Sequence, residues 1–197
     1  MNDPNIYLAR HCRTDWNMQG RLQGKTDRGL SKDGIRQSEE NIRFLSGIGF
    51  DVIFSSPAKR AFQTARIYAE SLDIPVKIKP GFSELDHGDW EGKSISDLMN
   101  PANSRYSEWL KNPADVKIPG GSETVFQAAE RFIRDVRIIV SSYPGETVLI
   151  VSHKHIMALF ECAMDGYEFS RFREKIFETV TPRRISEEVI KKIPGSV

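Results

Sequence analysis

The sequence has few cysteines, no long apolar run and almost no net charge. Its two cysteines, Cys12 and Cys162, lie far apart and outside any CxxC or zinc-ligand spacing. This excludes a disulfide framework and argues against a structural zinc ion, so we expect two reduced thiols. No apolar run approaches the roughly 20 residues that cross a bilayer, and residues 1–4 lack the basic and apolar regions of a signal peptide. These absences predict a cytoplasmic protein with no membrane partner.

The balance of charge excludes another class of partner. The 197 residues include 28 Lys and Arg against 27 Asp and Glu, a formal net charge of +1. Such a chain lacks the field that drives non-specific binding to nucleic acid, so we expect no nucleic-acid partner and a purely local anion site. No repeat or linker interrupts the chain, which predicts a single domain over 1–197 with an atypical C-terminal tail at 170–197.

Short apolar runs alternate with amphipathic segments. The apolar runs predict strands at 6–9, 51–54, 76–78 and 147–151. Helical spacing predicts a helix capped by Ser31 and ending at Leu45, one capped by Ser56 with Pro57 in its first turn, one capped by Ser122 and ending near Val140, one over 155–164, and shorter ones at 94–99 and 106–110. The alternation predicts an α/β fold, a three-layer α/β/α sandwich with a mainly parallel central sheet.

Polar residues follow the predicted strands, where ligands of α/β folds bind. Arginine offers a planar fork that matches phosphate oxygens, and a helix N-terminus adds favourable potential for an anion. The sequence therefore predicts a phosphoryl-binding site at this edge of the sheet. The residues that carry the prediction are Arg10, His11, Arg60, Glu84 and His153.

The segment 10–28 is basic within a nearly neutral chain. Its ionisable side chains sum to +3, which would attract an anionic substrate. On composition alone such a run is more typical of a solvated surface, but its position beside the strand ends favours the substrate role.

Other phosphate chemistries can be compared with residue spacing. A P-loop needs four residues between its glycines, whereas Gly20 and Gly24 enclose three. A cysteine phosphatase would need an arginine six positions after its cysteine, but the residue six positions after Cys12 is Met18. Two arginines in one pocket disfavour a divalent cation, so we expect no catalytic metal. We also expect no cofactor. A metallophosphatase would draw its ligands from His11, Asp15, Asp86, His87, Asp89, His153 and His155.

His11 remains as the nucleophile. An imidazole attacks phosphorus only when neutral, and Arg10 and Arg60 would lower its pKa. Glu84 lies among apolar neighbours, where burial would raise its pKa toward that of a useful proton donor. On spacing alone, the carboxylates that rival Glu84 for this role are Asp86, Asp89 and Glu91.

Six ordered segments resemble one family. They read LARHCRTDWN at 8–17, GRLQGKTD at 20–27, SSPAKRAFQTA at 55–65, ELDHGDWEG at 84–92, PGGSE at 119–123 and VSH at 151–153. Together they are similar to the motifs of the histidine phosphatase superfamily, in its phosphoglycerate mutase-like branch 1.

The resemblance implies roles for individual residues. His11 would be phosphorylated during turnover, and Glu84 would protonate the leaving group and then activate water. The implied activity is metal-independent hydrolysis of a phosphomonoester on a small phosphorylated metabolite. The phosphoryl oxygens would be held by Arg10, Asn17, Arg60 and His153, and the candidate residues of the substrate rim are Arg13, Arg21, Gln23, Gly24 and Lys154.

Several positions depart from the family pattern. Cys12 stands where the family usually has glycine, Arg13 where it often has glutamate, and Lys154 and His155 replace small residues. If Cys12 kept the glycine conformation it would be strained, and its thiol would be acidic and oxidisable. A buried, inert thiol is the alternative. We interpret His87 and His155 as structural or rim residues.

The end of the chain also departs from the family. Members commonly finish with another strand, whereas 171–197 is charged and contains Pro182 and Pro194. We expect at most a short amphipathic helix within 183–193 and no edge strand. An uncovered sheet edge would favour pairing with a second copy, which predicts a homodimer.

Two alternatives to hydrolysis stay open. A cofactor-dependent phosphoglycerate mutase would share the phosphohistidine. The resemblance implies that such mutases are longer chains with an insertion after the donor loop, whereas the segment from Glu84 to Ile118 is short here. A non-catalytic member that binds phosphorylated ligands is the other. Specificity would lie in 94–118, and the additional basic groups favour a substrate with more than one negative group.

Overall fold

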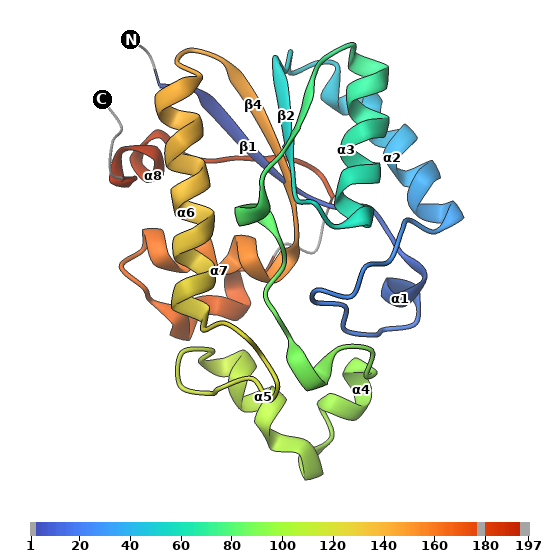
Figure 1. Ribbon diagram of the computed structural model, residues 1–197, viewed down its shortest axis with the longest axis vertical. Coiled ribbons are helices and arrows are strands. Elements are labelled where there is room, and N and C mark those ends of the chain that lie inside the picture. Colours follow the sequence, from blue (N-terminus) through green and yellow to red (C-terminus); the bar gives the residue numbers. More distant parts are fainter. Residues whose placement is uncertain (1–2, 177–179, 194–197) are drawn as a thin grey trace.

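Five strands form one sheet in the computed structural model, which describes residues 3–176 and 180–193. The strands are β1 (Asn5–Arg10), β2 (Val52–Ser55), β3 (Val76–Ile78), β4 (Thr147–Ser152) and β5 (Arg183–Arg184). Their order is β3-β2-β4-β1-β5, and every neighbouring pair is parallel except β1 with β5. Because β1, β2 and β4 are parallel neighbours, they end at the same edge of the sheet (Figure 1).

Helices cover both faces of the sheet. The helices α2 (Lys32–Leu45) and α3 (Lys59–Leu72) lie against one face, and α6 (Val125–Ser142) and α7 (Lys154–Met164) lie against the other (Figure 1). The predicted α/β sandwich with a mainly parallel sheet is confirmed. The shorter helices are α1 (Asp15–Met18), α4 (Ile95–Leu98), α5 (Ser104–Lys111) and α8 (Glu187–Lys192), with 3-10 turns at Pro80–Phe82, Gly88–Trp90, Pro101–Asn103 and Phe169–Lys175.

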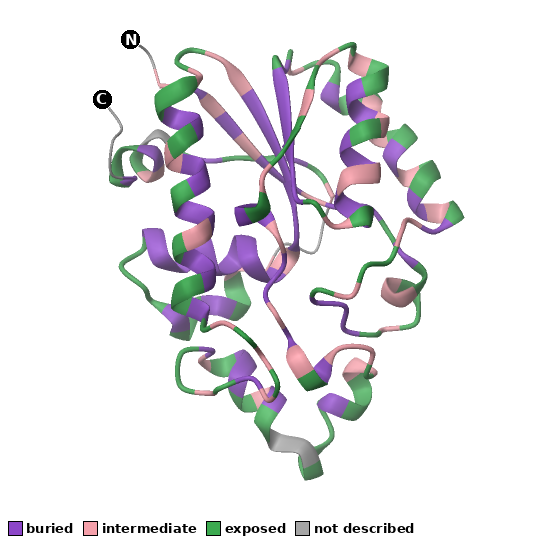
Figure 2. Ribbon diagram, viewed as in Figure 1, coloured by how far each residue is buried: buried purple, intermediate pink, exposed green. Residues whose placement is uncertain are grey.

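The central strands are mostly buried, as are residues along the helices on both sides of the sheet (Figure 2). The buried apolar residues form two core clusters. In β4, Val148 and Ile150 belong to the core cluster that includes α6 and α7, and Leu149 and Val151 belong to the cluster that includes α3. Successive strand residues point to opposite faces, so a strand covered on both faces is apolar at every position. This explains the uninterrupted apolar run that identifies β4 in the sequence.

The helix α3 begins at Lys59, two residues later than the sequence predicts. Ser56 and Pro57 lie before it, in the turn that leaves β2. The Ser56 hydroxyl accepts a hydrogen bond from the Ala58 N–H and lies 2.8 Å from Nε2 of His153, so it serves this turn and the histidine and does not cap the helix. The shift leaves Arg60 in the first turn of α3.

The other predicted helix starts are mostly confirmed. Ser31 caps α2, and α4 lies within the predicted segment 94–99. The helix α5 includes the predicted segment 106–110 but begins two residues earlier. Ser122 does not cap α6, because its hydroxyl and N–H bond to the carboxylate of Asp86. Thr124 caps α6 through a capping box.

The C-terminal tail contains an edge strand, so the prediction that it has none is wrong. β5 pairs with β1 in antiparallel orientation at Tyr7 and Leu8, and α8 follows within the predicted helical segment 183–193. Backbone pairing needs no apolar side chains, which is why a strand of two exposed arginines escapes sequence analysis. The homodimer prediction loses its premise, since β5 covers this edge of β1. Tail residues 177–179 and 194–197 lie outside the described residues.

None of the helices in the described part of the chain combines the length and the apolarity that a membrane crossing requires.

Candidate active site

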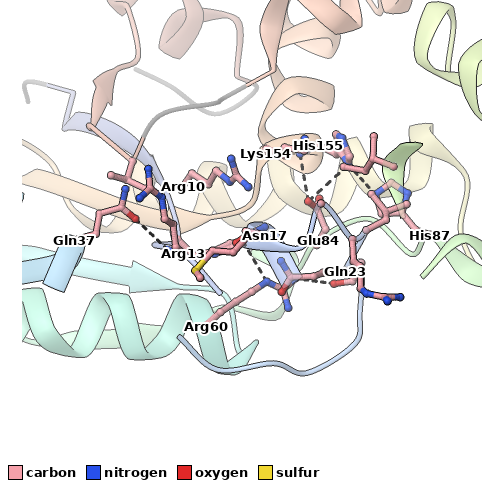
Figure 3. Close-up of a pocket in the computed structure, with 18 of the residues that line it drawn as sticks. Arg10, Arg13, Asn17, Gln23, Gln37, Arg60, Glu84, His87, Lys154 and His155 are labelled. Atoms are coloured by element: carbon pink, nitrogen blue, oxygen red, sulfur yellow. Dashed lines mark hydrogen bonds and ion pairs between the residues drawn. The ribbon is translucent and has the colours of Figure 1, made fainter. Parts of the chain in front are cut away.

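A cavity of about 580 Å³ lies at the carboxyl end of the sheet (Figure 3). The strand-end residues meet there because their strands are parallel neighbours. His153 is not part of the lining, but its ring centroid lies 5.1 Å from that of His11. The predicted residues that line the cavity are Arg10, His11, Arg13, Asn17, Arg21, Gln23, Gly24, Arg60, Glu84 and Lys154.

The lining is strongly basic. Among the described residues it holds the cationic side chains of Arg10, Arg13, Arg21, Arg60 and Lys154 and a single carboxylate, that of Glu84. A concave surface with one sign of charge concentrates ions of the opposite sign. The cavity therefore suits a multiply charged anion such as a phosphate ester.

His11 lies at the end of β1 with a defined tautomer. Its Nδ1 is 2.7 Å from the backbone carbonyl of Cys12, which can only accept, so Nδ1 carries the proton and Nε2 the lone pair. Nε2 accepts a hydrogen bond from Nε of Arg60 at 3.2 Å. Burial, followed by the charges of Arg60 and Arg10, holds the pKa of His11 well below its ordinary 6.5. The imidazole is therefore a neutral nucleophile near pH 7.

Arg60 connects the nucleophile to the basic loop. Besides His11, its guanidinium donates to the carbonyl of Thr26 at 3.0 Å and to the carbonyl of Gly24 at 2.7 Å. Burial lowers the pKa of Arg60 to about 10, against the opposing charge of Glu84, and the side chain remains a cation at neutral pH. One guanidinium therefore fixes the position of the loop at Gly24 and Thr26 and orients the imidazole of His11.

Glu91 holds the same loop from the other side. Its carboxylate accepts the N–H groups of Lys25 at 2.7 Å and Thr26 at 2.9 Å. Gly24 has φ +55°, and a Cβ there would collide with the Glu91 carboxylate, so glycine is required. Glu91 is therefore occupied in loop structure, which removes it as a rival of Glu84.

His153 occupies the N-cap position of α7 and is fully buried. Its Nε2 shares a hydrogen bond with the Ser56 hydroxyl, and its Nδ1 has no hydrogen-bond partner among the described residues. Burial first, then the charge of Arg60, lowers its pKa well below 6.5. Its ring therefore adds a neutral polar group beside His11.

Glu84 is held by backbone N–H groups. Its Oε1 accepts from Leu85 and from Ile156, both at 2.9 Å, and its Oε2 accepts from His155 at 3.3 Å. Two of these donors belong to the first turn of α7. Burial nevertheless raises the pKa of Glu84 above its ordinary value, because desolvation exceeds the effect of the hydrogen bonds. The result is a carboxyl group that can carry a proton at a higher pH than usual.

The remaining rivals of Glu84 are poorly suited to donate a proton. Burial acts to raise the pKa of Asp86, but hydrogen bonds from Ser122 and Gly88 prevail and lower it to about 2. Asp89 is exposed and does not line the cavity. The geometry therefore favours Glu84 as the acid.

Arg131 positions the segment that carries Glu84, and sequence reasoning missed it. From α6 its guanidinium donates to the carbonyls of Gly81 and Ser83 at 2.7 Å and to the carbonyl of Glu84 at 3.0 Å. Glu123 completes the contact with a two-point ion pair. Arg131 is partly buried, and nothing in the sequence distinguishes it from the surface arginines of the same helix.

His87 and His155 lie together in the cavity lining, although the sequence suggests structural or rim roles. His87 Nε2 is 2.8 Å from His155 Nδ1, and both rings are buried. Burial, followed by the charge of Lys154, lowers the pKa of His87 to about 3 and that of His155 well below 6.5. Glu84, His87 and His155 are the one group of potential metal ligands that converges among the described residues. The larger set considered for a metallophosphatase is not assembled.

The hypothesis of a strained, acidic Cys12 is wrong. Cys12 does not have a positive φ, and its N–H donates to Thr64 Oγ1 at 3.0 Å. Its thiol lies 3.4 Å from the Tyr68 hydroxyl, and burial raises its pKa. The residue therefore fits as a buried, inert thiol.

The rim draws on three parts of the chain. Asn17 lies in α1, a helix that the sequence did not predict, and its Oδ1 accepts the Thr14 N–H at 3.1 Å. From the segment expected to set specificity, 94–118, Ile95 lines the cavity. The tail contributes Val180 and Thr181, which sequence reasoning missed because nothing local indicates that the tail returns to the site.

Three comparisons relate the chain to known proteins. The model of the histidine phosphatase superfamily (branch 1) matches residues 6–186. The chain is 33% identical over 169 residues to phosphoserine phosphatase 1 of Hydrogenobacter thermophilus, covering 85% of this chain and 79% of that protein. It is 30% identical to the adenosylcobalamin/alpha-ribazole phosphatase of Escherichia coli, covering 82% and 78%. A mycobacterial glucosyl-3-phosphoglycerate phosphatase solved with VO3 shares the fold, with TM-score 0.83, 23% identity and coverage of 93% and 91%.

Proposed function

Because the chain belongs to branch 1 of the histidine phosphatase superfamily and is a phosphatase of that type, we propose that it hydrolyses the phosphomonoester of a small metabolite through a phosphohistidine on His11, without a metal. The observation that carries this proposal is the presence of a neutral His11 Nε2 and a buried Glu84 carboxyl in one basic cavity. A neutral nucleophile and a proton-bearing acid are what phosphoryl transfer to nitrogen requires.

In the first step, Nε2 of His11 attacks phosphorus. The P–N bond forms while the ester P–O bond breaks, and the leaving oxygen takes the proton of Glu84. Arg60 exchanges its hydrogen bond to His11 for one to a phosphoryl oxygen. The charge of the transferring group is stabilised by Arg10, Asn17, Arg60 and His153, as electrostatic stabilisation dominates phosphoryl transfer.

In the second step, water attacks the phosphohistidine. The Glu84 carboxylate takes a proton from the water, the P–N bond breaks, and its electron pair returns to Nε2 of His11. Inorganic phosphate leaves, and Glu84 is again protonated for the next substrate. The raised pKa of Glu84 suits this alternation between acid and base.

The substrate that we propose carries a second anionic group. Arg13, Arg21 and Lys154 line the cavity in addition to the arginines assigned to the phosphoryl group. Phosphoserine, for which one relative is named, has a carboxylate that such side chains would pair with. Equal rates on mono-phosphates and bis-phosphates at several salt concentrations would contradict this assignment.

We also propose a cytoplasmic location, supported by two free, buried thiols at Cys12 and Cys162. The homodimer stays a prediction, although its premise of an uncovered β1 edge is removed by β5. Size-exclusion chromatography with light scattering tests the oligomeric state directly.

The test is phosphate release from a panel of phosphomonoesters with EDTA present. Wild-type protein is compared with His11→Ala and with Arg66→Gln, an exposed change on α3 that serves as the control. We expect EDTA-resistant turnover that is lost in His11→Ala and retained in the control, with a phosphohistidine trapped by acid-free quenching.

Three results would overturn the proposal. Turnover that EDTA abolishes would indicate a metal enzyme. Isomerisation of phosphoglycerate with a phosphoenzyme that is stable for minutes would indicate a mutase. Binding of phosphorylated ligands by folded protein without any turnover would indicate a non-catalytic member.

A further inference from the structure

Two histidines converge on the proposed proton donor. One ligand atom each from Glu84, His87 and His155 lies within 4.8 Å of the others, and the three side chains are buried yet line the cavity (Figure 3). His87 Nε2 and His155 Nδ1 are 2.8 Å apart, and His155 Nδ1 is 4.0 Å from Oε2 of Glu84. Two imidazoles and one carboxylate form a zinc ligand set that leaves one coordination position open.

Among the described residues, the rings of His87 and His155 hydrogen-bond to nothing except each other. Their hydrogen bond to each other is the one that each ring makes, since Nδ1 of His87 and Nε2 of His155 have no partner there. Buried polar atoms without partners lower stability, so imidazoles serve a purely structural role poorly here. Trp109 packs edge-on against both rings and limits their movement to small rotations.

We propose that Glu84, His87 and His155 bind one Zn²⁺ ion, and that this ion inhibits the enzyme reversibly. The inhibition rests on the proposed function, whereas the binding does not. A Glu84 carboxylate that is bound to zinc cannot protonate the leaving group, and any proton it carried is released to solvent when the ion binds. The ion is thus a regulator of the site and takes no part in turnover.

Small movements bring the ligands into place. Bonds of about 2.0–2.2 Å to a tetrahedral zinc ion put the ligand atoms roughly 3.3–3.5 Å apart. The two imidazole nitrogens must therefore separate by about 0.5 Å, and the carboxylate must approach His155 by a similar distance. The ligand atoms of Glu84 and His87, which lie within 4.8 Å of each other, must approach by up to about 1.4 Å. Rotations of the rings about χ2 and of the Glu84 carboxylate about χ3, which are broad torsions, are the movements that we expect.

The charge of Lys154 opposes the ion. After burial itself, Lys154 is the largest cause that lowers the pKa of both His87 and His155, which places its charge within range of the proposed ligands. We therefore expect Lys154→Met to tighten zinc binding several-fold. The affinity of adventitious zinc sites elsewhere on the protein would not respond to Lys154→Met, so this change distinguishes them from the proposed site.

The binding test uses Co²⁺ and Zn²⁺ alone with the full-length protein. The visible absorption of tetrahedral Co²⁺ reports binding, and Zn²⁺ then displaces it. We expect one equivalent in the wild type and an affinity at least tenfold weaker in both His87→Gln and His155→Gln. His11→Gln, which removes another imidazole of the same cavity, is the matched control and should bind as the wild type does.

Absence of saturable binding by the wild type would overturn the proposal, as would unchanged affinity in both variants that retain native circular dichroism. Inhibition of phosphate release should follow the same affinity as the titration, and EDTA should reverse it. If Zn²⁺ inhibited His155→Gln at the same concentrations as the wild type, the regulatory role would be overturned. A wild type that binds one Co²⁺ but hydrolyses nothing would refute the proposed function and support the metal site.

Discussion

Nε of Arg60 donates a hydrogen bond to Nε2 of His11 over 3.2 Å, so the guanidinium proposed to bind the phosphoryl group also contacts the atom proposed to attack it. In the free protein this contact orients the imidazole, and burial together with the positive charge of Arg60 keeps a proton off the lone pair. A substrate oxygen must replace Nε2 as the acceptor before Nε2 can react. Arg60 is therefore coupled to His11 through both phosphoryl binding and the pKa of the imidazole.

Replacement of Arg60 should affect both properties. Arg60→Gln removes a charge-assisted donor from the transition state, and we expect kcat/KM to fall by about 10²–10³-fold. Because Arg60 lowers the pKa of His11, its loss raises that pKa, and the acid limb of the kcat/KM profile should move to higher pH. A pH–rate profile measures both effects. An unchanged acid limb, with Arg66→Gln as the control, would contradict the coupling.

Replacement of Glu84 should have an effect that depends on the leaving group. Glu84→Gln cannot protonate an alkoxide, so we expect a loss of about 10²–10⁴-fold on alkyl phosphates and a smaller loss on p-nitrophenyl phosphate. Hydrolysis of the phosphohistidine is also impaired, which predicts a burst of p-nitrophenol equal to the enzyme concentration. Stopped-flow absorbance measures the burst. The control is Asp89→Asn in the same loop, and equal losses on both substrates would contradict the role.

The strand-end residues could be predicted because parallel pairing leaves little freedom. The register of β1 with β4 continues to Arg10 opposite Ser152, so His11 and His153, the next residues along each strand, must be neighbours. An apolar run that ends in a polar residue marks this point in the sequence. The same pattern marks the end of β2, and Arg60 follows it in the first turn of α3.

The contacts between loops could not be predicted in this way. Glu84 reaches the N-terminus of α7, Arg131 reaches back to the Glu84 segment, and His87 meets His155, each across long stretches of sequence. No periodicity records which loop packs on which helix. The tail strand β5 is hidden for a related reason, since its pairing uses backbone groups that every residue has.

Arg131 should affect both stability and the chemical step. Arg131→Met leaves the carbonyls of Gly81, Ser83 and Glu84 without their donor, and we expect the free energy of unfolding to fall by about 2–3 kcal/mol. The displaced Glu84 should also lower kcat on alkyl phosphates more than it raises KM. Urea unfolding and steady-state kinetics measure these effects. Arg134→Met, an exposed change on α6, is the control, and wild-type values in Arg131→Met would contradict the assignment.

Both thiols should be unreactive in the native protein. Burial raises the pKa of Cys12 and raises that of Cys162 to about 11, so the reactive thiolate is scarce and inaccessible. We expect both thiols to react with dithionitrobenzoate only after unfolding in urea. A fast native phase that disappears in Cys12→Ala, but persists in Cys162→Ala, would show that the thiol beside His11 is accessible.

Acid should destabilise the fold steeply, because all four histidines are buried with pKa values below 6.5. Below pH 6.5 the unfolded chain binds protons that the native histidines do not, so this contribution to stability is complete above pH 6.5 and is lost as pH falls. Glu84 acts in the opposite sense, since its raised pKa lets the native state hold a proton first. A net uptake of about three protons on unfolding corresponds to roughly 4 kcal/mol between pH 6 and pH 5.

Urea unfolding at pH 7.5, 6 and 5 measures this slope. His87→Gln should reduce it by about one proton, and a free energy of unfolding that is constant over this range would show that the histidines are charged in the native protein.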